Sequence, residues 1–134
     1  MSGLRYLLDT NFLLGMMKSD PAVHRLLQNV CPLSGECGYS AVTRMELLGF
    51  PGITDAEESA IKSRLQGLAY LAVDRRVEDA AISLRRSRRV KLPDAVIAAT
   101  ALVHGLELLT LDEGLLTVMT SVDSSKVSTP VPRA

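Results

Sequence analysis

The chain has 134 residues, of which 47% are hydrophobic and 22% are charged, with a mean hydropathy of +0.19. This composition is typical of a folded domain and excludes a disordered protein. Fifteen basic and fifteen acidic residues cancel, so the net charge neither indicates nor excludes a nucleic-acid partner. The length predicts one domain spanning residues 1–134, because two ordinary domains need a longer chain.

Strands and helices are expected to alternate from end to end, because apolar runs are each followed by a helical pattern. Four strands are predicted, at residues 4–9, 36–42, 67–73 and 106–112. The tail after about residue 122 is expected to be loosely ordered or to form a short last strand near residues 126–129. This alternation predicts an α/β fold with a central, mainly parallel sheet of four to five strands flanked by helices.

Capping residues mark the expected helix starts. Asp20 precedes a proline, and Thr54 is followed three residues later by Glu57, as in a capping box. A third helix, PDAVIAATALVHG, is expected to open at Pro93 and to stop at Gly105. Its many alanines predict close packing against the sheet or a neighbouring helix.

Several features argue against a membrane or secreted protein. The longest apolar stretch, residues 95–103, is far shorter than the roughly 20 residues that span a bilayer. A secretion signal has an unbroken apolar segment, whereas the polar segment DTN at residues 9–11 interrupts the first apolar run here. The spacing of Cys31 and Cys37 matches neither a redox pair nor a zinc site, and free thiols in a reducing cytosol are expected. We therefore expect a soluble, cytoplasmic protein.

Four acidic residues are expected at one edge of the sheet. Asp9 ends the first strand, and Asp112 ends the last strand, LELLTL. Glu46 is expected in the first turn of the helix after YSAV, and Asp94 in the first turn of the alanine-rich helix. Open parallel sheets bind ligands beyond the carboxyl ends of their strands, so all four side chains should point into one site.

Helix capping explains each of these acids taken singly. Aspartate is a favoured N-cap, Glu46 stands three residues after Thr43 as in a capping box, and Asp94 complements a helix dipole. Capping explains their convergence poorly, because unpaired anions repel and raise each other's pKa. A hard divalent cation such as Mg²⁺ or Mn²⁺ would relieve that repulsion, and no His or Cys cluster indicates zinc.

The segments that carry these acids resemble the PIN-domain family, particularly the VapC-type toxins of bacterial toxin–antitoxin modules. In chain order they are RYLLDTNFLL, YSAVTRMELLGFP, VKLPDAVIAATAL and LELLTLD. The resemblance implies a single PIN-like domain in which the four acids bind Mg²⁺ or Mn²⁺ and cleave RNA. It also implies that neighbouring polar side chains orient the carboxylates or a metal-bound water: Thr10, Asn11 and Thr110.

The segment after the fourth acid departs from the family pattern. Many relatives carry a further Asp followed by Phe there, whereas this chain continues from Asp112 with Glu113, Gly114 and Leu115. Either Asp112 alone or Asp112 together with Glu113 is therefore expected to complete the site.

Hydrolysis by a metal-activated water is the expected reaction. A carboxylate and metal site activates water, and no pair of histidines is present to promote attack by the ribose 2′-hydroxyl. The RNA products should then carry 5′-phosphate and 3′-hydroxyl ends. Aromatic residues make up only 4% of the chain, which disfavours base stacking and favours recognition of structured RNA, such as tRNA or rRNA, by its shape.

A basic run just ahead of Asp94 is the local signal for RNA. The run RRSRRVK at residues 85–91 contains five cations, namely Arg85, Arg86, Arg88, Arg89 and Lys91. A solvated helix end, whose cations complement the helix dipole, explains the run equally well by itself. Its proximity to Asp94 favours contact with phosphate.

The resemblance also implies protein partners. Relatives of the toxin type form homodimers and are silenced by a cognate antitoxin that covers the acidic groove, often with a basic side chain. The segment MELLGF, or Leu13, Met16 and Met17, are candidate contacts, although such residues are more often core.

Two other functions remain as alternatives. A non-catalytic binding protein could keep the PIN fold, although all four acids are intact. A phosphatase of the haloacid dehalogenase type also begins with an aspartate after a first strand. That class needs a second aspartate two residues later, where this chain has Asn11.

Overall fold

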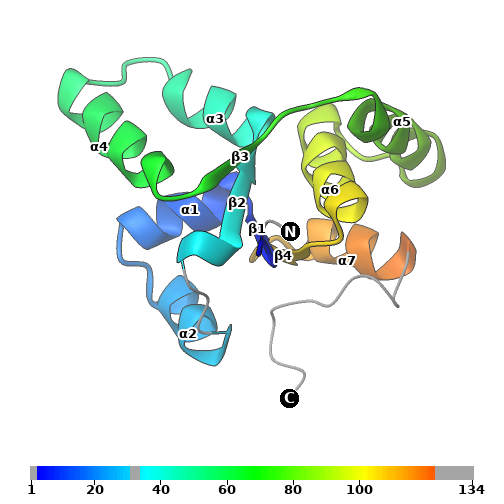
Figure 1. The fold of residues 1–134 in the computed structure, drawn as a ribbon, viewed down its shortest axis with the longest axis horizontal. Coiled ribbons are helices and arrows are strands. Elements are labelled where there is room, and N and C mark those ends of the chain that lie inside the picture. Colours follow the sequence, from blue (N-terminus) through cyan, green and yellow to red (C-terminus); the bar gives the residue numbers. More distant parts are fainter. Residues whose placement is uncertain (1–2, 31–33, 123–134) are drawn as a thin grey trace.

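Four short parallel strands form the centre of the computed structural model, which describes residues 3–30 and 34–122 (Figure 1). In sheet order they are β3 (Ala69–Leu71), β2 (Cys37–Ser40), β1 (Tyr6–Leu8) and β4 (Glu107–Leu109). Every pairing in this sheet is parallel, which confirms the predicted α/β class. The short strand expected near residues 126–129 lies outside the described residues.

The strands are shorter than the sequence predicts, because capping side chains start the next helix at once. The Asp9 carboxylate accepts a hydrogen bond from the Phe12 N–H and so begins α1 directly after β1. The Ser40 hydroxyl accepts from the Thr43 N–H at 3.1 Å, which puts residues 41 and 42 in a helix instead of the predicted strand. Side-chain hydrogen bonds of this kind compete with sheet pairing.

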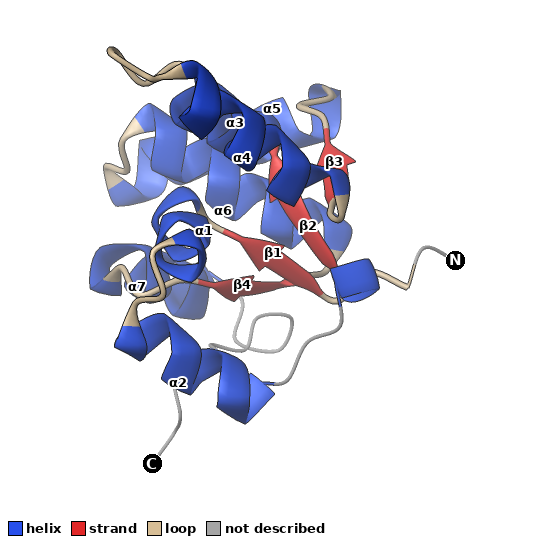
Figure 2. Ribbon diagram, turned by 90° about the vertical axis from the view of Figure 1, so that its left-hand side faces the viewer, coloured by secondary structure: helices blue, strands red, loops and turns tan. Residues whose placement is uncertain are grey.

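Helices cover both faces of the sheet. In chain order they are α1 (Thr10–Met17), α2 (Pro21–Val30), α3 (Ala41–Leu48), α4 (Asp55–Gln66), α5 (Arg75–Arg88), α6 (Leu92–His104) and α7 (Glu113–Val122), with a 3₁₀ turn at Ser34–Glu36. Figure 1 shows α1 to α4 on one side of the strands and α5 to α7 on the other. Figure 2 views the same sheet from the side of α1 to α4, with α5 and α6 behind it.

Alternation along the strands divides the buried side chains into two clusters. Leu7 and Leu108 pack with residues of α5, α6 and α7. Tyr6, Leu8 and Leu109 pack with residues of α1 to α4 on the other face. Successive residues of a strand point to opposite faces, so each apolar strand supplies both clusters. The sheet is therefore covered on both sides, as parallel sheets require.

The alanine-rich helix α6 packs as closely as its composition predicts. Ala95, Ala98, Ala99 and Ala101 are fully buried, and α6 lies mainly against α5. The helix begins at Leu92, one residue before the predicted Pro93, and ends at Gly105, whose φ of +65° is the left-handed stop that favours glycine. The predicted caps at Asp20 and at Thr54 with Glu57 are also present.

Two smaller expectations concern thiols and membranes. Cys37 carries a buried thiol, and burial, with a smaller effect of Glu36, raises its pKa to about 11. Cys31 lies outside the described residues. Among the helices of the described ranges, none has the length and apolar character needed to cross a bilayer.

The strand order brings separate parts of the chain to one edge of the sheet. The chain leaves β1 for β2 and β3, and then returns to pair β4 with the other side of β1. This reversal is the point at which open α/β sheets bind ligands. Leu8 pairs with Leu109, so Asp9 and Thr110 are the next residues beyond the paired ends of β1 and β4.

Replacing a buried alanine of α6 tests this packing. We expect Ala98→Leu to lower the free energy of unfolding by about 1–3 kcal/mol, because extra methyl and methylene groups do not fit a filled core. Urea denaturation measures the change. The control is Ala56→Leu on the exposed face of α4, expected to change stability by less than about 0.5 kcal/mol. Equal stability of the two variants would contradict the close packing of α6.

Candidate functional site: an acidic cluster at the edge of the sheet

Asp9 is a buried carboxylate at the end of the central strand. Only 4% of the residue is exposed. Oδ1 accepts a hydrogen bond from the Phe12 N–H at 2.7 Å, and Oδ2 accepts one from the Thr110 hydroxyl. Burial raises the pKa of Asp9, and the charges of Asp112 and Asp94 raise it further, against the two hydrogen bonds, which lower it. No Lys or Arg within the described residues forms an ion pair with this carboxylate.

Thr110 joins Asp9 to Asp112. The buried Thr110 hydroxyl donates to Asp9 and accepts the Asp112 N–H at 3.0 Å. The Asp112 carboxylate in turn accepts the Leu115 N–H at 3.0 Å and so begins α7. Asp112, unlike Glu113, raises the pKa of both Asp9 and Asp94. The charge nearest the other acids is therefore that of Asp112.

Asp94 interacts electrostatically with each of the other acids. It is half-buried in the first turn of α6, as the sequence predicts. Burial raises its pKa, followed by the charges of Asp112 and Glu46, while Lys91 lowers it. A crossover helix runs antiparallel to the strands it joins, so its first turn lies at the carboxyl edge of the sheet. Asp94 is thus electrostatically linked to the three other acids.

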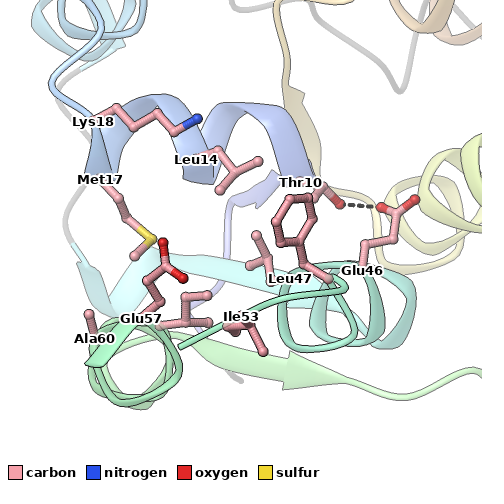
Figure 3. Close-up of a pocket in the computed structure, with 11 residues that line it drawn as sticks. Thr10, Leu14, Met17, Lys18, Glu46, Leu47, Ile53, Glu57 and Ala60 are labelled. Atoms are coloured by element: carbon pink, nitrogen blue, oxygen red, sulfur yellow. Dashed lines mark hydrogen bonds between the residues drawn. The ribbon is translucent and has the colours of Figure 1, made fainter. Parts of the chain in front are cut away.

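Glu46 does not cap its helix, so the capping alternative is wrong, and so is the expected position in the first turn. Ser40 caps α3, Thr43 supplies the N–H that Ser40 binds, and Glu46 lies in the second turn instead of the first. The Thr10 hydroxyl instead donates to Glu46 Oε1 at 2.6 Å and lies 3.0 Å from the Thr43 hydroxyl. This long-range contact orients Glu46, and Figure 3 shows the pair at the rim of a pocket.

The other predicted polar neighbour, Asn11, is not drawn into the cluster. Its side chain is exposed and forms no hydrogen bond with any residue of the described ranges. Thr10 and Thr110, by contrast, each hold one acid in place. The structure therefore brings together the four acids and two of the three polar residues.

The donor set suits a hard divalent cation. All candidate ligands are carboxylate or hydroxyl oxygens, the type that Mg²⁺ and Mn²⁺ prefer. In residues 3–30 and 34–122, no three His, Cys, Asp or Glu side chains converge closely enough to hold a metal as they stand. Binding of a cation would require the more exposed carboxylates to turn toward Asp9. The charges of neighbouring acids help to raise the pKa of Asp9 and that of Asp94, and a cation would relieve this repulsion.

A basic cavity adjoins Asp94 and Asp112. It has a volume of about 270 Å³, and its lining includes the side chains of Arg88, Arg89 and Lys91 together with the two aspartates. Arg85 and Arg86, the other cations of the predicted basic run, do not line it. The run is therefore divided between a cavity beside the acids and the exposed end of α5.

An apolar groove adjoins Glu46 on the other side. It has a volume of about 350 Å³ and lies between α1, α3 and α4 (Figure 3), with a lining that includes Thr10, Leu14, Met17, Phe50 and Ile53. Met17 and Phe50 belong to the segments in which the sequence suggests partner contacts, and the structure places both in this groove. The rest of the lining comes from three helices and the loop after α3, which the sequence pattern alone does not bring together.

The predicted partner contacts differ in their exposure. Leu13 is fully buried, so its prediction as a surface residue is wrong, and Met16 is partly buried against the core. In the MELLGF segment, Met45 is 61% exposed and Phe50 is 64% exposed. These are the large apolar side chains that the segment offers to a partner.

Several solved bacterial structures resemble this fold over nearly the whole chain. A toxin–antitoxin complex from Klebsiella pneumoniae matches with 26% sequence identity and a TM-score of 0.74, covering 93% of this chain and 97% of that one. FitAcB from Neisseria gonorrhoeae matches with 24% identity and a TM-score of 0.72, over the same shares of the two chains. VapBC-1 from nontypeable Haemophilus influenzae matches with 19% identity and a TM-score of 0.75, covering 96% of this chain and all (100%) of that one.

The family comparison identifies the domain. No curated protein matches the sequence. A family model described as PIN domain matches residues 6–119, which include all four acids, both threonines and the whole described sheet. The chain therefore belongs to the PIN-domain family.

Proposed function

We propose that this protein is a divalent-metal-dependent endoribonuclease and the toxin of a type II toxin–antitoxin system. VapC-type toxins of the PIN-domain family are nucleases, and nucleases of this family generally depend on a divalent metal. The observation that carries the proposal is the gathering of four carboxylates from four parts of the chain. Within the described residues none of the four forms an ion pair. A purely structural site would pair such charges, since unpaired charge near the interior destabilises the fold.

Asp9 and Asp94 would hold the metal, with Glu46 and Asp112 completing its surroundings. When bound, the cation supplies an electrophile for the phosphate and an acidified water as nucleophile. Thr110 fixes the Asp9 carboxylate through Oδ2. Thr10 fixes Glu46 through Oε1, which leaves Oε2 to accept a proton from the attacking water. Attack by water gives the 5′-phosphate and 3′-hydroxyl ends expected from the sequence.

Structured RNA of the tRNA or rRNA class is the proposed substrate. The described part of the chain has few exposed aromatic side chains for base stacking, Phe50 and Tyr70. Recognition of the backbone and of helix shape needs no such platform. A haloacid-dehalogenase-type phosphatase has no support in the PIN-domain match, and Asn11 stands where that chemistry needs an acid.

The apolar groove is the proposed site of the antitoxin. Its lining is mostly apolar, it is flanked by the exposed Phe50, and it carries Glu46 and Glu57. An antitoxin segment with apolar anchors and a basic side chain would fill the groove and pair with Glu46. The solved neighbour from Klebsiella pneumoniae is a toxin–antitoxin complex, which supports this assignment. Homodimer formation stays a prediction from the sequence, and light scattering measures it.

Substitution of Asp94 tests the nuclease. Purified protein is incubated with total cellular RNA in Mg²⁺ or Mn²⁺, and fragment ends are mapped. We expect discrete cuts with 5′-phosphate ends, abolished by EDTA and reduced at least about 100-fold in Asp94→Asn, since loss of about 3 kcal/mol of metal and transition-state binding has that effect. Asp79→Asn, an exposed acid of α5, is the matched control. Cleavage by Asp94→Asn at the control rate would favour the non-catalytic PIN-fold alternative.

Thermal unfolding tests the metal site without RNA. We expect Mn²⁺ to stabilise the wild-type protein, by about 2.7 kcal/mol when its concentration is a hundred times the dissociation constant. Asp94→Asn should lose this effect. The raised pKa values of Asp9 and Asp94 mean that protons compete with the metal, so the stabilisation should shrink as the pH is lowered. Equal Mn²⁺ stabilisation of wild type and Asp94→Asn would place the metal elsewhere.

A charge in the apolar groove tests the partner site. The chain is co-expressed with a candidate antitoxin taken from an adjacent reading frame, and the complex is purified. We expect Phe50→Asp to abolish co-purification, because binding would remove the hydration of the new carboxylate without replacing its hydrogen bonds. RNA cleavage should remain intact. Ile82→Asp on α5, also an exposed apolar residue, is the control. Retention of the partner by Phe50→Asp would exclude this groove.

A further inference from the structure

Three cations at the end of α5 share a cavity with two of the acids. Arg88, Arg89 and Lys91 are exposed side chains, and they line the cavity of about 270 Å³ that Asp94 and Asp112 also line. Lys91 is close enough to Asp94 to lower the pKa of its carboxyl group. A ligand in this cavity would therefore contact cations and acids together.

The structure of the chain itself uses these cations little. The side chains of Arg89 and Lys91 form no hydrogen bond and no ion pair with the described residues. Arg88 donates one hydrogen bond, from Nη2 to the Ser121 carbonyl at 3.2 Å, which joins α5 to α7 and leaves its other N–H groups available.

The opposite end of α5 shows what paired arginines look like in this fold. There Arg75 lies 4.0 Å from Glu78, and Arg76 lies 3.5 Å from Asp74. Both helix ends carry arginines, and those that face the acidic cluster lack such partners.

Two of the cations occupy positions where local structure favours other residues. Arg89 ends α5 with φ of +54°, a left-handed conformation that glycine adopts most readily. Lys91 is the N-cap of α6, makes no side-chain capping bond, and places a cation at the positive end of the helix dipole. Complementing a helix dipole explains Arg85, Arg86 and Arg88 in the last turn of α5. It does not explain Lys91, and it does not explain why a residue other than glycine occupies the left-handed position of Arg89.

We propose that Arg88, Arg89 and Lys91 bind a phosphate of the RNA strand next to the phosphate that is cleaved. The inference rests on the proposed nuclease and adds the path of its substrate. An arginine fork binds two phosphate oxygens and a lysine adds a point charge. These contacts offset the repulsion between RNA and the four acids, and they draw the strand across Asp94 and Asp112.

The same arrangement separates RNA from the protein partner. Asp94 and Asp112 line the basic cavity, whereas Thr10 and Glu46 line the apolar groove. RNA therefore approaches the acids from the side of α5 and α7, and the groove between α1, α3 and α4 lies on another side of the cluster.

RNA binding in EDTA tests the proposal without cleavage. Short fluorescein-labelled single-stranded RNA and labelled total tRNA are titrated with the full chain at several salt concentrations. We expect the double variant Arg89→Ala/Lys91→Ala to bind about tenfold more weakly at low salt. The slope of log affinity against log salt should become less steep by about 0.7 for single-stranded RNA if one phosphate contact is lost. Cleavage assays in Mg²⁺ should show a raised KM with kcat largely retained.

Two further variants make the result specific. Arg75→Ala/Arg76→Ala removes the same charge from the other end of α5 and should bind RNA as the wild type does. Arg89→Gly relieves the left-handed backbone and should melt no lower than the wild type, yet should bind RNA more weakly. If Arg89→Gly is as stable as the wild type but binds RNA more weakly, the loss of affinity is due to the missing Arg89 guanidinium.

The outcomes separate this inference from the nuclease. If the wild type binds and cleaves RNA, and Arg89→Ala/Lys91→Ala has the same affinity, salt slope and KM, the cavity does not bind phosphate and the nuclease stands. If the Arg89→Ala/Lys91→Ala and Arg75→Ala/Arg76→Ala variants weaken binding equally, the effect is one of net charge, and the inference is overturned. If the wild type neither binds nor cleaves RNA, the proposed function and the inference fail together.

Discussion

The buried Asp9 carboxylate is the group on which the candidate site depends. It ends the central strand, begins α1 through the Phe12 N–H, and receives the Thr110 hydroxyl from the loop after β4. These contacts fix one negative charge at the reversal of strand order, where burial and the neighbouring acids raise its pKa. In the described part of the chain, Asp9 has no ion-pair partner. A buried carboxylate without such a partner lowers the stability of the folded protein. Buried carboxylates with a perturbed pKa are typical of functional sites.

The two sides of the cluster differ in their chemistry, and each suits one of the proposed partners. Thr10 holds Glu46 at the rim of an apolar groove, whereas Asp94 and Asp112 face a cavity that carries unpaired cations. Apolar surface suits a protein segment, and cations suit a phosphate backbone. A toxin that must cut RNA and also be silenced by a protein needs both surfaces close to one set of acids, and this small domain places both beside the cluster.

Much of this arrangement follows from local sequence signals, and the rest depends on contacts between distant residues. The strand that ends in Asp9 and the helix that begins near Asp94 are marked by apolar runs, a proline and a glycine stop, so the class of fold and the edge that carries the acids could be predicted. The strand lengths were overestimated, since Ser40 caps a helix within a run that reads as a strand. The contact of Thr10 with Glu46 joins residues far apart in the sequence, and the burial of Leu13 depends on packing that periodicity alone does not specify.

The central claim is that the four acids form one site for a divalent cation. Anomalous diffraction from a crystal of the protein soaked in Mn²⁺ tests it most directly, because the signal locates the metal independently of activity. We expect one anomalous peak, or two adjacent ones, at about 2 Å from carboxylate oxygens of Asp9 and Asp94, with Glu46 or Asp112 turned toward it. A crystal that binds Mn²⁺ only elsewhere, or that leaves these carboxylates without metal at saturating concentration, would show that the four acids do not form a cation site.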